Sequence, residues 1–357
     1  MISPAPDYTS ADQLKSRLST VFTPLSTLTP LSGGFANFTY RGTVSSGEPA
    51  TVIIKHAEPF AVALAQNIAL DTVRVLFEST ALSHPPPSVT TASGFTVSTP
   101  KVHHYDAESH SLVIADAGAG SSDLKALLLS APTAADLAAK ELGEALGMWL
   151  HRLHSWGRSE GAEELRSVLA RNTQAATVWT WVTYGQLVET VAMLPGAGLE
   201  GSAALFAEIA AATSAVQKTE TIVHGDFWCG NVLLGDTGAM VIDWEMARVG
   251  EVWGDLAQLC AELYLPFHFS GTEAGLEVMK EFLSAYGRVS EAVARRVVVH
   301  FGVHLVVWPV RSGWKTQSDV ERCAAVGKEF IERGWRSDWK WVKESVLGRL
   351  VDEGWIV

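Results

Sequence analysis

Four polar side chains stand close together in an otherwise apolar part of the sequence. The run IVHGDFWCGN is followed, after a short apolar stretch, by IDWE, and the two runs hold Asp226, Asn231, Asp243 and Glu245. Carboxylate and amide oxygens are the ligands that Mg²⁺ takes in proteins, where this ion usually accompanies phosphate groups. The two runs therefore indicate a polyphosphate held by magnesium.

The spacing of these residues predicts separate roles in phosphoryl transfer from ATP. Asp226 and Asn231 have the spacing D-x-x-x-x-N, in which the aspartate faces the acceptor hydroxyl and the asparagine holds a metal ion. Asp243 follows an apolar strand and supplies a second oxygen ligand. The reaction also needs a cation on the phosphates. Lys55 at the end of TVIIK is the candidate, and Glu78 on a following helix is its expected partner.

A glycine-rich run, SGGFAN, lies between two strand-like runs and is the candidate loop over the phosphates. Its residues Gly33, Gly34 and Asn37 can bring backbone N–H groups toward an anion. The run does not read G-x-G-x-x-G, and alone it is also typical of an ordinary turn. We include the three residues in the predicted nucleotide site because Lys55 follows on the next strand.

Length and composition predict two lobes and argue against several classes of protein. A chain of 357 residues exceeds the size at which one hydrophobic core stops growing, so two lobes with a cleft between them are expected. The formal charge of −12 argues against a nucleic-acid binder. The start of the chain lacks the features of a signal peptide, and no long apolar run occurs that would span a membrane. We therefore expect a soluble, cytoplasmic protein without membrane contact, and the three scattered cysteines fit a reducing compartment.

The elements that must position these residues change along the chain. Ser10 begins a short helical pattern. Beyond it, strand-like runs predict an antiparallel sheet, with one amphipathic helix at 61–82. The strand-like runs are 31–44, 48–57, 99–106 and 110–116.

The second part of the chain has a helical texture. Thr133 begins a helical pattern that runs to Trp156, and similar patterns continue to the C terminus, interrupted by a hairpin around GDTG. The predicted fold class is α+β. It comprises a β-rich nucleotide-binding lobe at 1–115, a hinge at 116–122, and a mainly helical catalytic and substrate lobe at 123–357.

Together, HGDFWCGNVLL, VIDWE and GDLA resemble the aminoglycoside phosphotransferase and choline kinase family of small-molecule kinases. The resemblance covers most of the chain and is strongest to the 5-methylthioribose-kinase-like branch and the 4-hydroxytryptamine kinases. It implies the bilobal protein-kinase-like fold, with adenine bound at the hinge near Ala115, Asp116 and Ala117.

The same resemblance implies residue roles and the cofactors ATP and Mg²⁺. Asp226 corresponds to the catalytic aspartate, Asn231 and Asp243 to the metal ligands, and Lys55 to the phosphate lysine. Asp255, in the run GDLA, corresponds to the residue that steadies the catalytic loop.

The sequence does not decide which molecule accepts the phosphate. The two candidate classes are an aromatic amine such as a hydroxytryptamine and a sugar such as methylthioribose, each with a hydroxyl group. Most tryptophans, including Trp314, are expected to fill the core, but an aromatic wall beside acidic residues would suit an amine. The candidate contacts with the acceptor are Trp228, Glu245, Asp255 and Trp308.

Two other functions remain as alternatives. A catalytically silent binding protein with this fold would not need the full set of polar residues. A protein kinase would need a peptide-docking segment, and only eleven residues separate Asp243 from Asp255. We expect a monomer or a homodimer.

Overall fold

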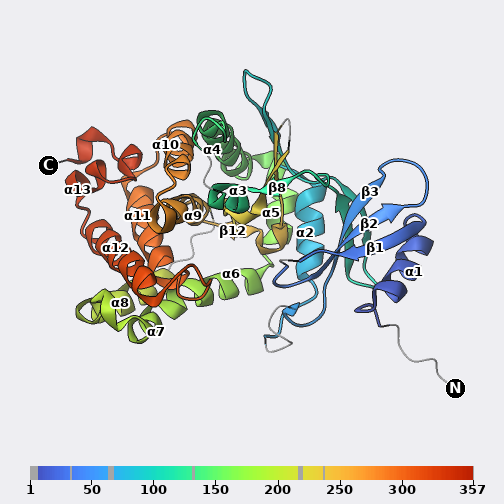
Figure 1. The fold of residues 1–357 in the computed structure, drawn as a ribbon, viewed down its shortest axis with the longest axis horizontal. Coiled ribbons are helices and arrows are strands. Elements are labelled where there is room, and N and C mark those ends of the chain that lie inside the picture. The colour runs from blue at the N-terminus through green and yellow to red at the C-terminus, as the bar shows by residue number, and fades with distance from the viewer. Residues whose placement is uncertain are drawn as a thin grey trace.

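The computed structural model describes residues 7–32, 34–62, 68–130, 133–215, 220–235 and 238–356. In Figure 1 the strands of the N-terminal part form a sheet at one end, and most of the helices gather at the other. The predicted α+β fold class, a small antiparallel sheet with a larger helical part, is confirmed.

The N-terminal sheet has five antiparallel strands in the order β1-β2-β3-β7-β6. Four of them lie within the predicted strand runs, whereas the edge strand β1 was not predicted. Only Leu25 of its six residues is buried, so β1 lacks the alternating pattern that marks a strand in the sequence. The strands are β1 (Leu25–Pro30), β2 (Phe38–Val44), β3 (Thr51–His56), β6 (Val102–Asp106) and β7 (Ser111–Ala115).

Strand β3 orients Lys55 because neighbouring side chains on a strand point to opposite faces. Val52 and Ile54 pack in the small core beneath α1 (Ala11–Val21). Ile53 instead packs against the large core, on the side of α2, and Lys55 shares that face by alternation. The strand therefore presents Lys55 away from α1.

Helix α2 spans Arg74–Ser83, so the predicted helix at 61–82 was too long at its N-terminal end. Phe60 and Ala69 instead form an isolated antiparallel bridge, and residues 63–67 lie outside the described part. The apolar spacing before position 74 reflects packing of an irregular segment. The remaining helix is buried on several sides, including the side of Glu78.

A second sheet carries the predicted hairpin. Strands β10 (Val232–Gly235) and β11 (Gly238–Val241) pair antiparallel, as predicted, and the two residues between them lie outside the described part. This sheet has the order β4-β5-β11-β10-β8, so strands of the proposed N-terminal lobe join the hairpin. The added strands are β4 (Val89–Thr90), β5 (Thr96–Ser98) and β8 (Ser122–Asp123).

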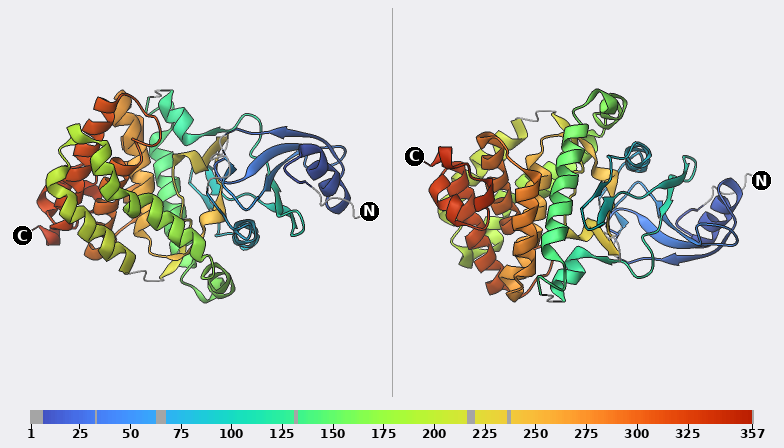
Figure 2. Two further views of the ribbon diagram at one scale, coloured as in Figure 1. Left: turned by 90° about the horizontal axis from the view of Figure 1, so that it is seen from below. Right: turned by 90° about the horizontal axis from the view of Figure 1, so that it is seen from above.

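Helices make up most of the remaining chain (Figure 2). The first long one, α4, begins at Ala139, six residues after the predicted start, because Thr133 caps only a turn and Ala138 has a left-handed backbone. The α-helices of this part are α3 (Leu124–Leu129), α4 (Ala139–Trp156), α5 (Glu163–Leu169), α6 (Thr173–Thr180), α7 (Gln186–Met193), α8 (Ala203–Ala215), α9 (Trp253–Ser270), α10 (Ala274–Tyr286), α11 (Glu291–Val307), α12 (Gln317–Trp335) and α13 (Trp339–Glu344).

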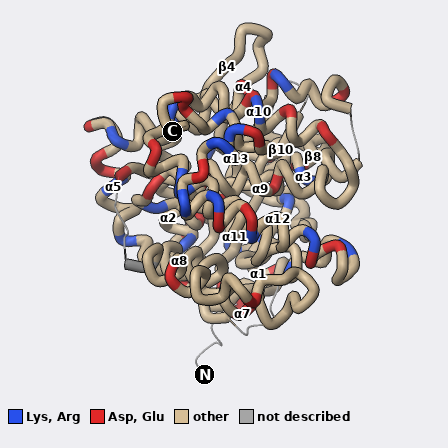
Figure 3. The backbone as a smooth tube through the Cα atoms, turned by 90° about the vertical axis from the view of Figure 1, so that its left-hand side faces the viewer, with Lys and Arg blue, Asp and Glu red and all other residues tan. Residues whose placement is uncertain are grey.

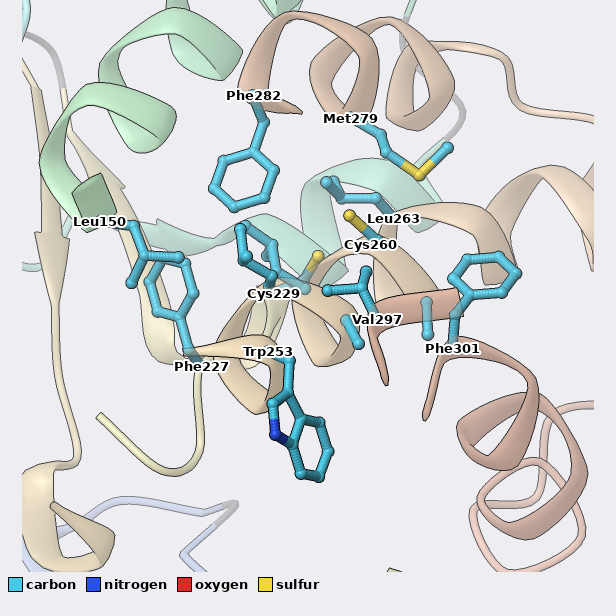
Figure 4. Packing of buried hydrophobic residues seen from close by; sticks show 14 of the residues in the cluster. Leu150, Phe227, Cys229, Trp253, Cys260, Leu263, Met279, Phe282, Val297 and Phe301 are labelled. Carbon is cyan, nitrogen blue, oxygen red and sulfur yellow. The ribbon is translucent and has the colours of Figure 1, made fainter. Parts of the chain in front are cut away.

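The helices α4 and α10 pack unusually closely because glycines of α4 face the neighbouring backbone. A Cβ atom at Gly143 would lie 2.4 Å from the carbonyl oxygen of Val278, and one at Gly147 would lie 2.3 Å from that of Phe282. Figure 4 shows Phe282, Phe227 and Leu150 meeting in the core beside α9. This packing supports the loop that begins at Asp226.

The charges on the helical end are mixed in sign. Figure 3 shows Lys and Arg interspersed with Asp and Glu on the side that it presents, without a broad region of one sign. In the described part of the chain, no helix is both long enough and apolar enough to cross a bilayer.

An ion pair between Arg17 of α1 and Asp106 of β6 joins the helix to the sheet and should contribute to stability. The guanidinium of Arg17 donates to both oxygens of Asp106 at 2.8 Å, and Ser109 donates to Oδ2 of the same carboxylate at 2.7 Å. The hydrogen bonds from Arg17 hold the pKa of Asp106 well below its ordinary value. The contribution of the Arg17–Asp106 pair to the free energy of unfolding is present above about pH 4 and is lost as the pH falls through the depressed pKa of Asp106.

Asp106→Asn is expected to lower the free energy of unfolding at pH 7 by about 1–3 kcal/mol, and by less at about pH 3. Urea unfolding at the two pH values measures the difference. Glu108→Gln is the matched control, since Glu108 contacts the same arginine but is 61% exposed, and it should cost under about 1 kcal/mol. Equal effects of the two substitutions would contradict the assignment.

Candidate active site

The candidate catalytic loop follows the short buried strand β9 (Thr221–Val223), which pairs with β12 (Arg248–Gly250). The side chains of the loop alternate between the core and the surface. Phe227 and Cys229 are fully buried, and burial raises the pKa of the Cys229 thiol well above its ordinary value. Asp226 and Trp228 remain partly exposed. The loop therefore presents the aspartate and the tryptophan, and the cysteine serves packing.

The carboxylate of Asp226 is surrounded by neutral donors. Asn231 donates to Oδ2 at 3.0 Å, and Gln258 of α9 donates to Oδ1 at 2.7 Å. The Trp228 side chain is a further donor. Burial and the nearby Asp243 carboxylate raise the pKa of Asp226 to about 7, against the lowering effect of these hydrogen bonds. A carboxylate with this pKa can accept a proton near neutral pH.

Asp255 holds the backbone of the loop. Its carboxylate accepts the N–H groups of His224 at 2.8 Å and Gly225 at 2.9 Å, and it contacts Nε2 of His154 at 3.2 Å. Burial raises the pKa of Asp255, but the His154 contact and the loop N–H groups outweigh it and the pKa lies below its ordinary value. Only 2% of Asp255 is exposed. The described contacts of this carboxylate are those of a residue that steadies the loop, which is one of the two roles expected for Asp255; the other was contact with the acceptor.

Gly225 and His224 fix the turn before Asp226. Gly225 has a φ of +82°, and a Cβ atom there would lie 2.3 Å from the carbonyl oxygen of Met246. His224 donates from Nε2 to the carbonyl of Ile242 at 3.0 Å and accepts the N–H of Asp226 at Nδ1. Burial lowers the pKa of His224, so the ring is neutral and links the loop to the hairpin.

Lys55 lies between two carboxylates. Its ammonium is 2.6 Å from Glu78 of α2 and forms a short hydrogen bond with Asp243, which follows the hairpin. Burial lowers the pKa of Lys55, but the charges of Asp243 and Glu78 outweigh this effect and raise it, so the ammonium is charged. The structure brings together the lysine, its expected partner and an expected metal ligand.

Glu245 joins the same group of charges. It accepts a hydrogen bond from Nδ2 of Asn37 at 2.6 Å and lies 3.4 Å from Nε of Arg74. Burial and the Asp243 carboxylate raise its pKa to about 7. The side chain of Asn37 is used on Glu245 and Arg74, whereas the contribution expected from this residue to the nucleotide site was its backbone N–H.

The donor set fits a divalent cation. Ligand atoms of Glu78, Asp243 and Glu245 lie within 4.8 Å of one another. When ionised they carry three negative charges against the two positive charges of Lys55 and Arg74, which leaves one negative charge. All are hard oxygen ligands of the kind that Mg²⁺ prefers.

Asn231 is positioned beside the same carboxylates. The N–H of Ile242 donates to its carbonyl at 3.0 Å, which places it next to Asp243. Its side-chain hydrogen bonds are donated by Nδ2, so Oδ1 is the atom available to a metal. Asn231 and Asp243 thus stand at neighbouring places on the hairpin, with Glu245 as an additional candidate that the sequence suggested only as an acceptor contact.

The expected adenine segment follows β7. Ala115 pairs with Val52 of β3, three residues along that strand from Lys55. Asp116 is held by Arg41 at 2.6 Å and by the N–H of Gly118 at 2.9 Å, so its carboxylate is committed within the chain. The contact that Asp116 could make with a nucleotide is then through its backbone.

Two other predicted residues are less defined. Gly34 lies near the Thr39 side chain and the Asn37 carbonyl. Gly33 lies outside the described residues. No described contact thus connects either glycine with Lys55.

The predicted acceptor contacts are distributed over two sides. Trp228 extends from the loop beside Asp226, whereas Trp308 ends α11 and lies near His304, with ring centroids 5.9 Å apart. Trp244 and Trp253, which the sequence assigned mainly to the core, are buried there. The structure therefore places Trp228 on the loop, whereas the described ring contact of Trp308 is with His304 at the end of α11.

Three positioning residues were missed from the sequence. Gln258 follows Asp255 by three residues on α9, and this i, i+3 spacing on a helix placed after GDLA was a usable signal. Arg74 had no local signal, since its partners lie far away in the sequence. His224 was visible in HGD, but its contact with Ile242 required the three-dimensional structure.

Comparisons with known proteins identify the family of this chain and several relatives. A model described as the phosphotransferase enzyme family matches residues 27–296. The phosphotransferase FrzJ of a Cladobotryum species is 26% identical, with 93% of this chain and 94% of that protein covered. The 4-hydroxytryptamine kinase of Psilocybe cyanescens is 25% identical, with 85% and 84% covered.

Solved structures share the fold. A choline kinase from Cryptosporidium parvum Iowa II matches with a TM-score of 0.52 and 10% identity, covering 95% of this chain and 98% of that one. An amicoumacin kinase in complex with AMP-PNP matches with a TM-score of 0.51 and 13% identity, covering 91% and 94%. At these identities the likeness shows a shared kinase fold.

The anchoring of the loop makes a prediction about Asp255. Asp255→Asn leaves one acceptor oxygen for two backbone N–H groups, so the loop should shift and kcat should fall by about 10²-fold, with the KM for ATP nearly unchanged. Steady-state kinetics measure both constants. Glu273→Gln, an exposed acidic residue before α10, is the control and should change neither. If Asp255→Asn instead raises the KM for the acceptor and leaves kcat normal, Asp255 contacts the acceptor and does not act by anchoring the loop.

Proposed function

The chain belongs to the phosphotransferase enzyme family, and from this premise we propose that it is an ATP-dependent kinase acting on a hydroxyl of a small metabolite. The setting of Asp226 carries the proposal. Its carboxylate receives hydrogen bonds from the neutral amides of Asn231 and Gln258 instead of a charged partner. A base in this setting is held in place without being neutralised by a cation.

In the proposed reaction, the acceptor oxygen forms a bond to the γ-phosphorus of ATP. The bond between that phosphorus and the bridging oxygen breaks, and ADP leaves with its electron pair. The hydroxyl proton passes to the carboxylate of Asp226, whose pKa of about 7 suits a proton acceptor. The Trp228 and Gln258 donors keep the carboxylate oriented toward the acceptor.

Lys55 acts on the phosphates in this proposal. Its ammonium is charged, and Glu78 of α2 holds it while also accepting the N–H of Trp244 at 3.2 Å. A bound Mg²⁺ would neutralise charge on the phosphate oxygens, and Asn231, Asp243 and Glu245 are the residues that would hold it. The work of this chain is therefore to position a base, a cation and oxygen ligands around one phosphoryl group.

A small acceptor is favoured over a protein substrate. The segment after Asp243 turns through Trp244–Met246 into β12, which pairs with β9, and α9 begins at once. A protein kinase would use this segment to dock a peptide. The short, paired connection supports a site for a small molecule.

An amine is our first candidate for the acceptor. Relatives named 4-hydroxytryptamine kinase cover most of this chain. Trp228 lies beside Asp226, and an ammonium over an indole face gains about 0.5–2 kcal/mol. A sugar such as methylthioribose is the second candidate, as the resemblance of the motifs suggests.

Product analysis tests the proposal and separates these candidates. The protein is incubated with ATP, Mg²⁺ and 4-hydroxytryptamine, methylthioribose or an aminoglycoside. ADP release and the mass of the product are measured. A phosphoester on the indole and none on the sugar supports the amine. Absence of ATP-dependent product with every hydroxyl acceptor would favour the catalytically silent alternative.

Two variants are expected to separate chemistry from nucleotide binding. Asp226→Asn should lower kcat by about 10² to 10⁴ and leave ATP affinity nearly unchanged, because it removes the proton acceptor. Lys55→Met should weaken ATP binding and also lower kcat, since its charge acts on the phosphates throughout the reaction. ATP titration and initial rates distinguish the two. The reverse pattern would exchange the roles.

The metal assignment predicts a change in the Mg²⁺ requirement. Asp243→Asn removes one negative charge from the oxygen ligands, so the Mg²⁺ concentration for half-maximal rate should rise at least about tenfold. Rates measured over a series of Mg²⁺ concentrations give this value. Asp123→Asn, whose carboxylate caps α3, is the control and should keep the original requirement. An unchanged requirement in Asp243→Asn would remove this residue from the metal site.

A further inference from the structure

A lysine of this chain lies between two tryptophans close to the candidate active site. The ammonium of Lys125 is 4.9 Å from the ring centroid of Trp228 and 4.9 Å from that of Trp314. The same nitrogen is 3.4 Å from Oε2 of Glu262. We call Trp228, Trp314 and Glu262 the tryptophan clamp.

Both indoles of the clamp are fixed by their own neighbours. Trp314 stacks on Phe269 with centroids 4.9 Å apart and ring planes 14° apart. Trp228 lies against Gly230, where an added Cβ atom would come within 2.3 Å of the ring. The two faces therefore do not depend on Lys125 for their orientation, and this preorganisation favours binding of a cation.

The carboxylate of the clamp is buried and oriented. Glu262 is 7% exposed, and its Oε1 contacts Nε2 of His304 at 2.8 Å. Burial raises the pKa of Glu262, but the contacts with His304 and Lys125 outweigh it and bring the pKa below the ordinary value. A charged carboxylate therefore faces the space between the indoles.

The clamp lies next to the proposed base. Trp228 follows Asp226 by two residues and is also a donor to its carboxylate. Gln258, which donates to Asp226, precedes Glu262 by four residues on α9, so the two side chains share a helix face about one turn apart. The proposed base and the clamp carboxylate are therefore linked to neighbouring turns of α9.

Lys125 is held loosely in this position. Its distance of 3.4 Å from Glu262 exceeds the roughly 2.7–2.9 Å of a close charged hydrogen bond, and a quarter of the side chain is exposed. Its four-carbon stem is flexible. The backbone, by contrast, is fixed, because Asp123 caps α3 and pairs with Leu233 of the hairpin. The ammonium can leave for solvent while its helix stays in place.

We propose that Lys125 is a tethered occupant of an ammonium-binding subsite, and that a cationic acceptor binds by displacing it. This inference rests on the proposed function, which supplies the small-molecule acceptor. It makes Lys125 the residue that sets selectivity between cationic and neutral acceptors. Removal of the lysine leaves the Glu262 carboxylate and two indole faces without a cation. A cationic molecule then gains these partners without opposition, whereas a neutral molecule of the same shape gains the vacated space but leaves the carboxylate unpaired, so its affinity changes little.

Calorimetric titration with choline and with 3,3-dimethylbutan-1-ol tests this inference. The two probes have nearly the same shape, and only choline is charged. Lys125→Met should lower the Kd for choline by about 5- to 30-fold, which is about 1–2 kcal/mol and corresponds to the upper part of the range of one cation–π contact. The Kd for the neutral alcohol should change less than about twofold. Lys125→Arg keeps a cation and should show little gain for choline.

Two further variants control the experiment. Lys140→Met removes the same charge from an exposed position at the start of α4 and should change neither Kd. Trp314→Leu, added to Lys125→Met, should abolish the gain for choline, since it removes one face of the clamp. An unchanged or weakened choline affinity in Lys125→Met, or an equal gain for both probes, overturns the inference.

Binding and turnover are separate readouts here. Calorimetry needs no phosphoryl transfer, so a selective gain for choline supports the subsite even if no ATP turnover is found. If the protein turns over ATP but Lys125→Met does not change the affinity for choline relative to the neutral alcohol, the proposed function is supported and the role of Lys125 as a tethered occupant is wrong.

Discussion

The buried ammonium of Lys55 is the interaction on which the site depends. Burial of an unpaired charge is costly, and Lys55 is only 8% exposed. Its two carboxylate partners come from α2 and from the end of the β10–β11 hairpin. The strand, the helix and the hairpin must therefore meet at one place for the charge to be stabilised. Removing either partner would leave a buried charge partly uncompensated, so the three elements are coupled energetically.

The loop of Asp226 is held by a different kind of force. Here a buried carboxylate, Asp255, accepts backbone N–H groups, while the Asp226 side chain itself receives neutral amide donors. The anchoring charge and the proposed reacting carboxylate are thus separated. This arrangement orients Asp226 and leaves its pKa near neutrality, whereas a salt bridge would have lowered it.

Much of the fold and of the candidate site could be predicted from short-range patterns. The presence of β3 and of the hairpin follows from short apolar runs bounded by turn residues, which also locate Lys55 and Asp243. The start of α2, the edge strand β1 and the partners of Arg74 could not be predicted, because packing and contacts between distant segments decide them. The acceptor side was the least predictable. Its clamp joins Trp228 to Trp314 through Lys125, and these three residues lie on three separate segments.

The connection between the two parts of the chain has a thermodynamic consequence. The segment proposed to hold adenine leaves β7 at Ala115 and enters β8 seven residues later, and Lys125 follows directly on α3. A nucleotide that shifts this segment would also shift the helix carrying Lys125. Any such effect of nucleotide on acceptor affinity must be matched by an equal effect of acceptor on nucleotide affinity. The short connection thus provides a physical route for the two substrates to bind cooperatively or antagonistically, and ternary-complex formation would reveal its sign.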